Sequence, residues 1–375
     1  MTKYQSQQKR IGITTWYRNG NYGGTLQAVG LLKTLEKLGY KAEFTDFCPR
    51  EGLYKYRILK PMKNLCVAYM YPQSYCSRNK IYQFIAEELP QSPKFYNYGD
   101  LMDYANENYD AAICGSDQIW HSYNGIEPYY FLSYMNGHKI AYAPSIGLNF
   151  IKPQFRTEFK HYIEKFDALS IREETGRKLI LEYTGRDAKV VIDPSMLLTK
   201  REWLNFMTEK KEITNILPMN QYILCYILGN ETKYCHFINR LSQKLALPVY
   251  YISSARNNIR LQKEVISCGV RGFINLINNT NYFLTDSYHG FLFGMALHVK
   301  RLGLFRRFID GEARCQNSRI DQVLVYFNMQ RHEISDESDI NQFLEMDCDY
   351  NVVDLKMTSF RSDSISYLNN ALNIN

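Results

Sequence analysis

The chain has 375 residues, of which 45% are hydrophobic, and it carries a formal net charge of +7. This length and composition predict two medium-sized globular domains and exclude a disordered chain. The modest positive charge suits an anionic substrate or a membrane surface, and the lack of a basic stripe or recognition motif argues against nucleic acid. The 31 tyrosines fit sugar stacking or an interface as well as ordinary packing.

The nine cysteines are scattered singly, without a CxxC pair or the Cys/His spacing of a zinc site. We therefore expect no metal ion. Their odd number and the lack of a signal peptide predict a cytoplasmic protein. No hydrophobic run approaches the roughly 18 residues of a membrane span, which leaves open a peripheral contact with the inner face of the membrane.

The N-terminal stretch predicts a βαβ unit. A strand at 11–16 is followed by a glycine-rich turn, a helix at 25–38 with leucines on one face, and a second strand at 42–47. The turn contains GNYGG, which lacks the GxGxxG spacing and argues against a Rossmann oxidoreductase.

This glycine-rich turn is open to two interpretations. It is either a plain connection or a backbone cradle for an anion, with Gly23 and Gly24 in the cradle and Arg18 and Asn21 nearby. We favour the cradle, because glycine-rich turns between a strand and a helix often bind ligands.

Residues 50–100 differ in composition, being rich in Tyr, Lys, Arg and Pro. They predict a helical insertion with an amphipathic piece at 81–89. The insertion could cover an active site, rest on a membrane or face solvent. We favour solvent, because runs of charge usually face water.

Polar residues follow three later strands of the first half, predicted at 109–114, 139–143 and 168–171. They include Asp117 and Arg172. Ligands of open α/β sheets bind at the carboxyl ends of strands, and an arginine there can grip a carboxylate or phosphate with two hydrogen bonds. The alternative for Arg172 is an intrahelical pair with a neighbouring glutamate.

A second set of alternating strands and helices begins after the crossing at 190–195. We expect an N-terminal Rossmann-like domain at 1–190 and a C-terminal one at 191–355. A helix at 356–375 would pack back on the first domain. Two α/β domains facing a cleft predict the glycosyltransferase B-type architecture.

The second set contains the stretch FINLINNTNYFLTDSYHGFLFGMAL at 273–297. It predicts a helix, a buried strand at 282–285, a tight turn and a helix from His289. This pattern fits an anion site at the start of a helix. It fits equally a helix cap by Asp286 or Ser287 beside a structural histidine.

Several stretches occur in the order found in one known family. They read GITTWYRNGNYGGTLQAVGLLKTLEKLGY, CGSDQIW, AYAPSIG, LSIREETG, VIDPSMLL, YILCYILG, LTDSYHG and NSRI. The set runs from about residue 11 to residue 320 and resembles the polysaccharide pyruvyl transferase family.

The resemblance implies transfer of the pyruvyl group of phosphoenolpyruvate onto two hydroxyls of a sugar, forming a cyclic ketal and releasing phosphate. The acceptor would be a bacterial surface polysaccharide, such as a capsule or exopolysaccharide, or its lipid-linked precursor. Phosphoenolpyruvate would be a substrate, and no cofactor is implied.

The resemblance also implies roles for particular residues. His289 matches the family's motif histidine and would be the general acid, because the ordinary histidine pKa of about 6.5 suits both acid and base catalysis. Arg172 matches an arginine of the family and would hold an anion of the substrate. Asp117 would be a base or bind a sugar hydroxyl. Further binding candidates, by position, are Arg319, Asn317, Ser287, Arg18, Asn21, Gly23 and Gly24.

One position departs from the family's pattern. Better-described members carry an arginine two residues before the histidine, where this chain has Ser287. Another residue would have to supply the positive charge of that arginine. The candidates are Arg18, Arg172, Arg306, Arg307 and Arg319.

Two other functions fit the same pattern. A glycosyltransferase of this architecture would use a nucleotide-sugar donor and ignore phosphoenolpyruvate. A non-catalytic partner in capsule assembly would use the tyrosine-rich 50–100 region as an interface and would not need His289.

Overall fold

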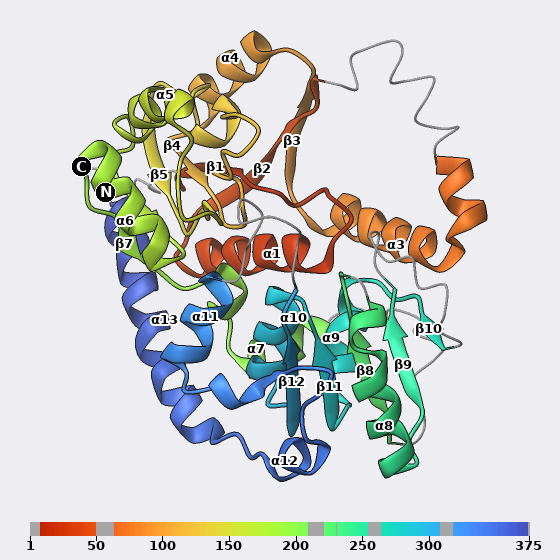
Figure 1. Ribbon diagram of the computed structural model, residues 1–375. Helices are drawn as coiled ribbons and strands as arrows, with labels where there is room; N and C mark the ends of the chain where they lie inside the picture. The colour runs from red at the N-terminus through yellow and green to blue at the C-terminus, as the bar shows by residue number, and fades with distance from the viewer. Residues whose placement is uncertain are drawn as a thin grey trace, which may run out of the picture.

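The computed structural model describes residues 8–49, 64–208, 221–229, 231–253, 264–307 and 318–373. They form two α/β halves, one above the other in Figure 1, each built on a parallel sheet. Asn317 lies outside the described residues. Within those residues, no helix is long and apolar enough to cross a membrane.

The first half is a five-stranded parallel sheet in the order β3-β2-β1-β4-β5. Its strands are β1 (Arg10–Thr14), β2 (Lys41–Phe47), β3 (Gln91–Phe95), β4 (Ala111–Cys114) and β5 (His138–Ala141). The helices around it are α1 (Tyr22–Lys37), α3 (Pro72–Glu88), α4 (Tyr98–Asn108), η2 (Pro128–Phe131), α5 (Pro153–Ile163) and α6 (Glu174–Thr184). The pair β6 (Ser170–Ile171) and β7 (Lys189–Val190) continues beside β5, through a bridge from Ile140 to Ala168.

The second half repeats this order with one more strand, β10-β9-β8-β11-β12-β13. Its strands are β8 (Ile223–Tyr226), β9 (Val249–Ile252), β10 (Val265–Ile266), β11 (Tyr282–Thr285), β12 (Arg301–Phe305) and β13 (Glu333–Ile334). Its helices are α7 (Lys200–Thr208), η4 (Glu231–Lys233), α8 (Cys235–Leu245), α9 (Val270–Asn278), α10 (Tyr288–Ala296), α11 (Ser318–Tyr326), η6 (Gln330–His332) and α12 (Ile340–Glu345). Both orders are those of a Rossmann fold, so the predicted glycosyltransferase B-type architecture is confirmed.

Helix α1 lies between the two sheets in Figure 1 and is buried on most of its surface. Its leucines fill the core of the first half, and Tyr22 at its start donates a hydrogen bond to the carbonyl of Cys268 in the second half, at 2.8 Å. A β-carbon built on Gly30 would lie 2.1 Å from the Pro194 carbonyl oxygen of η3 (Pro194–Met196). The helix therefore packs backbone to backbone against the segment that joins the halves.

Two parts of the predicted organisation are wrong. Residues 91–95 form β3, a strand of the first sheet, so they do not belong to an insertion. Helix α3 does not simply face solvent either: Ile81 and Ile85 are buried, and Lys80 Nζ donates a hydrogen bond to the Ser267 carbonyl of the second half at 3.1 Å. Burying the two isoleucine side chains stabilises the fold by roughly 1.5–3 kcal/mol each.

The terminal helix α13 (Tyr350–Leu372) begins at Tyr350 and not at residue 356. It runs along the left of Figure 1 from the second half to the first. The Ser364 hydroxyl accepts a hydrogen bond from Ile192 N at 2.9 Å, and the Tyr367 hydroxyl donates one to the Ala141 carbonyl, also at 2.9 Å. Its C-terminal part is thereby fixed to the first sheet.

Candidate active site

The ends of two strands and the start of one helix converge where the two halves meet. The carboxyl ends of β4 and β6 supply Ser116 and Arg172 from the first half, and the first turn of α10 supplies Tyr288 and His289 from the second. Ser287 caps that turn, because its hydroxyl accepts a hydrogen bond from Gly290 N at 3.2 Å. The cap fixes the direction in which His289 leaves the helix.

The Asp193 carboxylate is the centre of this group and is almost fully buried. Its Oδ2 atom lies 2.7 Å from Arg172 Nη1, 3.2 Å from the Ser116 hydroxyl and 3.5 Å from His289 Nε2. Its Oδ1 atom accepts hydrogen bonds from the backbone N and hydroxyl of Ser195. Burial raises the pKa of Asp193, but the facing His289 and Arg172 outweigh it and hold that pKa well below the ordinary value. Asp193 is therefore an anion at neutral pH.

His289 lies between this carboxylate and the start of α1. It is 8% exposed, with Nε2 toward Asp193. Its other ring nitrogen, Nδ1, would lie 2.4 Å from a β-carbon built on Gly23. A glycine at position 23 is therefore what lets the histidine ring approach the helix.

Arg172 presents two donors beyond its ion pair with Asp193. Its side chain is 2% exposed, and Nε and Nη2 have no hydrogen-bond partner among the described residues. These two N–H groups share one edge of the guanidinium, the fork that binds a carboxylate or phosphate with two parallel bonds. Two buried donors without partners carry a desolvation cost, which a bound anion would remove.

A second arginine stands beside the first, on the ring of Tyr288. The guanidinium carbon of Arg172 lies 4.7 Å from the centre of that ring, and that of Arg319 lies 5.2 Å from it. Burial and the positive charge of Arg172 lower the pKa of Arg319 to about 10. Two buried cations therefore share one tyrosine ring.

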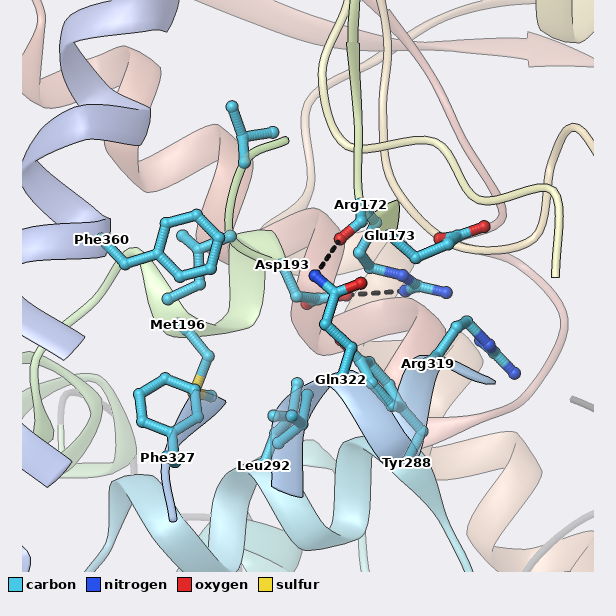
Figure 2. A pocket seen from close by; sticks show the side chains of 13 residues that line it. Arg172, Glu173, Asp193, Met196, Tyr288, Leu292, Arg319, Gln322, Phe327 and Phe360 are labelled. Carbon is cyan, nitrogen blue, oxygen red and sulfur yellow. Dashed lines mark hydrogen bonds and ion pairs between the residues drawn. The ribbon is translucent and has the colours of Figure 1, made fainter. Parts of the chain in front are cut away.

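The group borders a cavity of about 30 Å³ between the halves, shown in Figure 2. Arg172, Glu173, Asp193, Arg319 and Gln322 gather at one end of this view. Met196, Phe327 and Phe360 lie at the other end, which is apolar. A cavity of this size admits water, and a larger molecule requires the lining side chains to separate.

Gln322 of α11 connects the backbone of residues 172–174 to the second half through hydrogen bonds. Its amide oxygen accepts a hydrogen bond from Glu174 N at 2.7 Å, and its amide nitrogen donates to the Arg172 carbonyl at 3.4 Å. Glu173 turns away and accepts from the backbone of Ile146 and Gly147. The intrahelical arginine–glutamate pair considered for Arg172 is therefore absent among the described residues, and Asp193 is the partner instead.

The sequence comparison decides the family. The family model of polysaccharide pyruvyl transferase matches residues 21–304, most of the chain. The chain belongs to the polysaccharide pyruvyl transferase family. A search of curated proteins finds no match.

Solved structures with similar folds are distant in sequence. The glycosyltransferase SnogD from Streptomyces nogalater aligns with a TM-score of 0.46 and 10% identity, covering 96% of this chain and 95% of that one. The UDP-GlcNAc 2-epimerase of Methanocaldococcus jannaschii aligns with a TM-score of 0.48 and 12% identity, covering 95% and 94%. ADP-heptose heptosyltransferase II of E. coli aligns with a TM-score of 0.36 and 11% identity, covering 95% and 99%.

In this member of the polysaccharide pyruvyl transferase family, His289, Arg172, Arg319 and Gly23 meet in one group. Two other candidates cap helices: Asn21 accepts a hydrogen bond from Gly23 N at the start of α1, and Ser287 caps α10. The alternative cap, Asp286, instead accepts from Leu228 N and Gly229 N.

The remaining candidates lie at the edge of the group or outside it. Asp117 accepts a hydrogen bond from Gln118 N, and its charge acts on both Arg172 and Arg319. Arg18 pairs with Asp46 at the end of β2, away from His289. Gly24 leaves room for the Trp16 carbonyl. The anion cradle at residues 23–24 remains a prediction.

The sequence analysis missed Asp193, Tyr288 and Ser116 as site residues. An acidic residue directly after the apolar run VVI was the available signal for Asp193, but it was interpreted as a strand end at the crossing. No group of three or more Asp, Glu, His and Cys side chains suited to a metal ion occurs in the described part of the chain.

The Gly23–His289 contact gives a direct test. Gly23→Ala is expected to lower the rate of the family's reaction roughly 10- to 100-fold, because the new methyl group must displace the imidazole. Gly99→Ala, whose β-carbon would meet only Asn97 Oδ1 at 3.5 Å, is the matched control and should leave the rate unchanged. Steady-state rates of both variants would measure the effect, and an unchanged rate for Gly23→Ala would contradict it.

Proposed function

We propose that the chain is a pyruvyltransferase that uses phosphoenolpyruvate. It would join the pyruvyl group to two hydroxyls of a sugar in a bacterial surface polysaccharide or its lipid-linked precursor, as a cyclic ketal. The observation that carries the proposal is the meeting of His289 and Arg172 at the Asp193 carboxylate, with Nε and Nη2 of Arg172 left for a ligand. A proton donor and an anion grip within one buried group are what this reaction requires.

Binding of the donor follows from the two arginines. The Arg172 fork, Nε with Nη2, would take the carboxylate of phosphoenolpyruvate, and Arg319 beside it would take the phosphate. The cavity of about 30 Å³ cannot hold this molecule, so the lining side chains must part when it enters.

The chemical steps then balance without a further reactant. His289 gives a proton to the methylene carbon, whose π electrons form the new C–H bond and leave an oxocarbenium-like C2. One sugar hydroxyl adds to C2 and returns a proton to the histidine. Phosphate leaves with the C–O bonding pair, and the second hydroxyl adds. One hydroxyl proton ends on the methyl group and the other on phosphate.

Two measurements separate this proposal from the glycosyltransferase alternative. We expect phosphate release from phosphoenolpyruvate that depends on added lipid-linked oligosaccharide. We also expect phosphoenolpyruvate to raise the melting temperature, since a ligand at 100 times its Kd stabilises a protein by about 2.7 kcal/mol. Stabilisation by a uridine- or guanosine-nucleotide sugar, with no phosphate release, would reject the proposal. A lipid-linked acceptor would bring this protein to the cytoplasmic face of the membrane.

A further inference from the structure

A second cavity lies in the first half, at the carboxyl ends of β1 and β2. Its volume is about 390 Å³, within the usual range for small-molecule sites. Five aromatic side chains line it: Trp16, Tyr17, Phe47, Tyr129 and Tyr130. Ligands of open α/β sheets bind at this edge.

The aromatic wall is held in a fixed geometry. The Tyr130 ring meets Trp16 edge to face, with the ring centres 6.2 Å apart, and lies 5.1 Å from Tyr129. Tyr129 is anchored by a 2.9 Å hydrogen bond from its hydroxyl to the Thr45 carbonyl. Rigid aromatic faces with polar edges suit the C–H faces and hydroxyls of a sugar ring, and they lose little entropy on binding.

The charges of this cavity cancel. Arg18, 34% exposed, pairs with the Asp46 carboxylate, which is 7% exposed, and both line the cavity. Unlike the group around Arg172, the described lining of this cavity has no second arginine to attract a phosphate, and the remaining N–H groups of Arg18 and the carboxylate oxygens of Asp46 can bind hydroxyls. The cavity therefore favours a neutral polyol over an anion.

The cavity also adjoins the group around Asp193. The hydroxyl of Thr15, which lines the cavity, donates to the Ser116 carbonyl at 2.8 Å. The Ser116 hydroxyl in turn donates to Asp193 Oδ2, the atom that faces His289. One residue thus separates the cavity wall from the proposed reaction centre.

We propose that this cavity binds a sugar ring of the acceptor and presents its hydroxyls toward His289. The proposal rests on the proposed function for the identity of the acceptor, though not for the binding of sugar. Tyr130 and Trp16 would stack on the ring, and the Arg18–Asp46 pair would bind its hydroxyls.

Trp16 provides a direct reporter of binding. The chain has three tryptophans, all in the described residues; Trp120 and Trp203 are 1% and 0% exposed, whereas Trp16 is partly exposed on the cavity wall. The probe is the soluble sugar mixture released by mild acid from the lipid-linked glycans of the source organism. We expect a saturable change in tryptophan emission, absent in Trp16→Phe. Intact lipid-linked glycan should give the same change, and uridine monophosphate should not.

The variants separate stacking from folding. Tyr130→Ala should raise the KM for the lipid-linked acceptor roughly tenfold and leave the KM for phosphoenolpyruvate unchanged. Tyr69→Ala is the control, because this tyrosine is 89% exposed and does not line the cavity. Equal melting temperatures of wild type and Tyr130→Ala would show that the fold is intact, and the milder Tyr130→Leu replaces that variant if it unfolds.

The outcomes distinguish this inference from the proposed function. Sugar-dependent emission without phosphate release would keep the cavity assignment and reject the pyruvyltransferase. Phosphate release with an unchanged acceptor KM in Tyr130→Ala would keep the enzyme and reject the cavity. A change in emission with uridine monophosphate but not with sugar would also overturn the assignment.

Discussion

His289→Asn is expected to reduce acceptor-dependent phosphate release by a factor of about 10² to 10⁴, the usual contribution of a general acid. Asparagine fills similar space and keeps polar groups near Asp193, but it cannot deliver a proton at neutral pH. Arg172 and Arg319 stay in place, so the donor should bind the variant nearly as well. The measurement is kcat, together with the rise in melting temperature caused by phosphoenolpyruvate.

A second histidine provides the control for this prediction. His236 faces Asp336 at 3.7 Å, and its side chain is 64% exposed. His236→Asn therefore repeats the exchange beside a carboxylate on the surface and should leave kcat unchanged. If His289→Asn kept the wild-type rate while His236→Asn behaved as expected, another residue would have to be the acid.

Asp193→Asn is expected to lower the free energy of unfolding by about 3–5 kcal/mol, the usual cost of breaking a buried ion pair. The amide can still accept a hydrogen bond, but it leaves Arg172 as a buried cation facing a neutral group. Catalysis should fall as well, because the carboxylate positions both Arg172 and His289. Urea denaturation at pH 7 measures the first effect.

The difference in stability between wild type and Asp193→Asn should depend on pH. The pKa of Asp193 in the folded protein lies well below its ordinary value. The stability that its charge contributes is therefore complete above the unfolded pKa of about 3.9 and is lost as the pH falls toward the folded value. The difference between wild type and Asp193→Asn should stay constant from pH 7 to about pH 5 and narrow below about pH 4.

An exposed ion pair supplies the matched control. Asp187 binds Arg177 at 2.6 Å, and its side chain is 58% exposed. Asp187→Asn makes the same chemical change where water already screens the charges, so the urea midpoint should not move measurably. A loss of stability in Asp187→Asn as large as that in Asp193→Asn would contradict the role given to burial.

The sequence predicts a site residue when its place after a strand is enough to bring it to the site. Arg172 directly follows β6, and His289 lies in the first turn of the helix after β11, so strand ends alone place each residue at the carboxyl edge of its own sheet. Asp193 could not be assigned this way. Its importance depends on Arg172 and His289 reaching it from opposite halves, which no local spacing encodes.

The error about residues 50–100 has a physical origin. Their composition is polar enough for a surface insertion, yet one face of α3 is buried and β3 belongs to the first sheet. The composition of a segment is an average over all faces of a helix, whereas burial differs from one face to another.

Ser287 stands where better-described members of the family have an arginine two residues before the histidine, and here it caps α10. Arg172 and Arg319 remain the candidates for the missing charge, because both lie on the ring of Tyr288, next to His289 in sequence. Tyr288 supports both guanidinium groups. Restoring an arginine at 287 would remove the cap and add a third cation to the group.

The two places where the described chain crosses between the halves touch each other, through the hydrogen bond from Ile192 N to Ser364 Oγ. Because these crossings lie side by side, we expect any relative rotation of the two halves to pivot about them. Toward α3, a rotation would have to break the hydrogen bond from Lys80 to the Ser267 carbonyl, the Arg271–Glu88 ion pair and the ring contact between Phe84 and Phe206. Arg172 belongs to the first half and His289 to the second. An opened molecule would part Arg172 from both Arg319 and His289. Binding of the donor by two arginines and protonation by His289 would therefore both require the closed state.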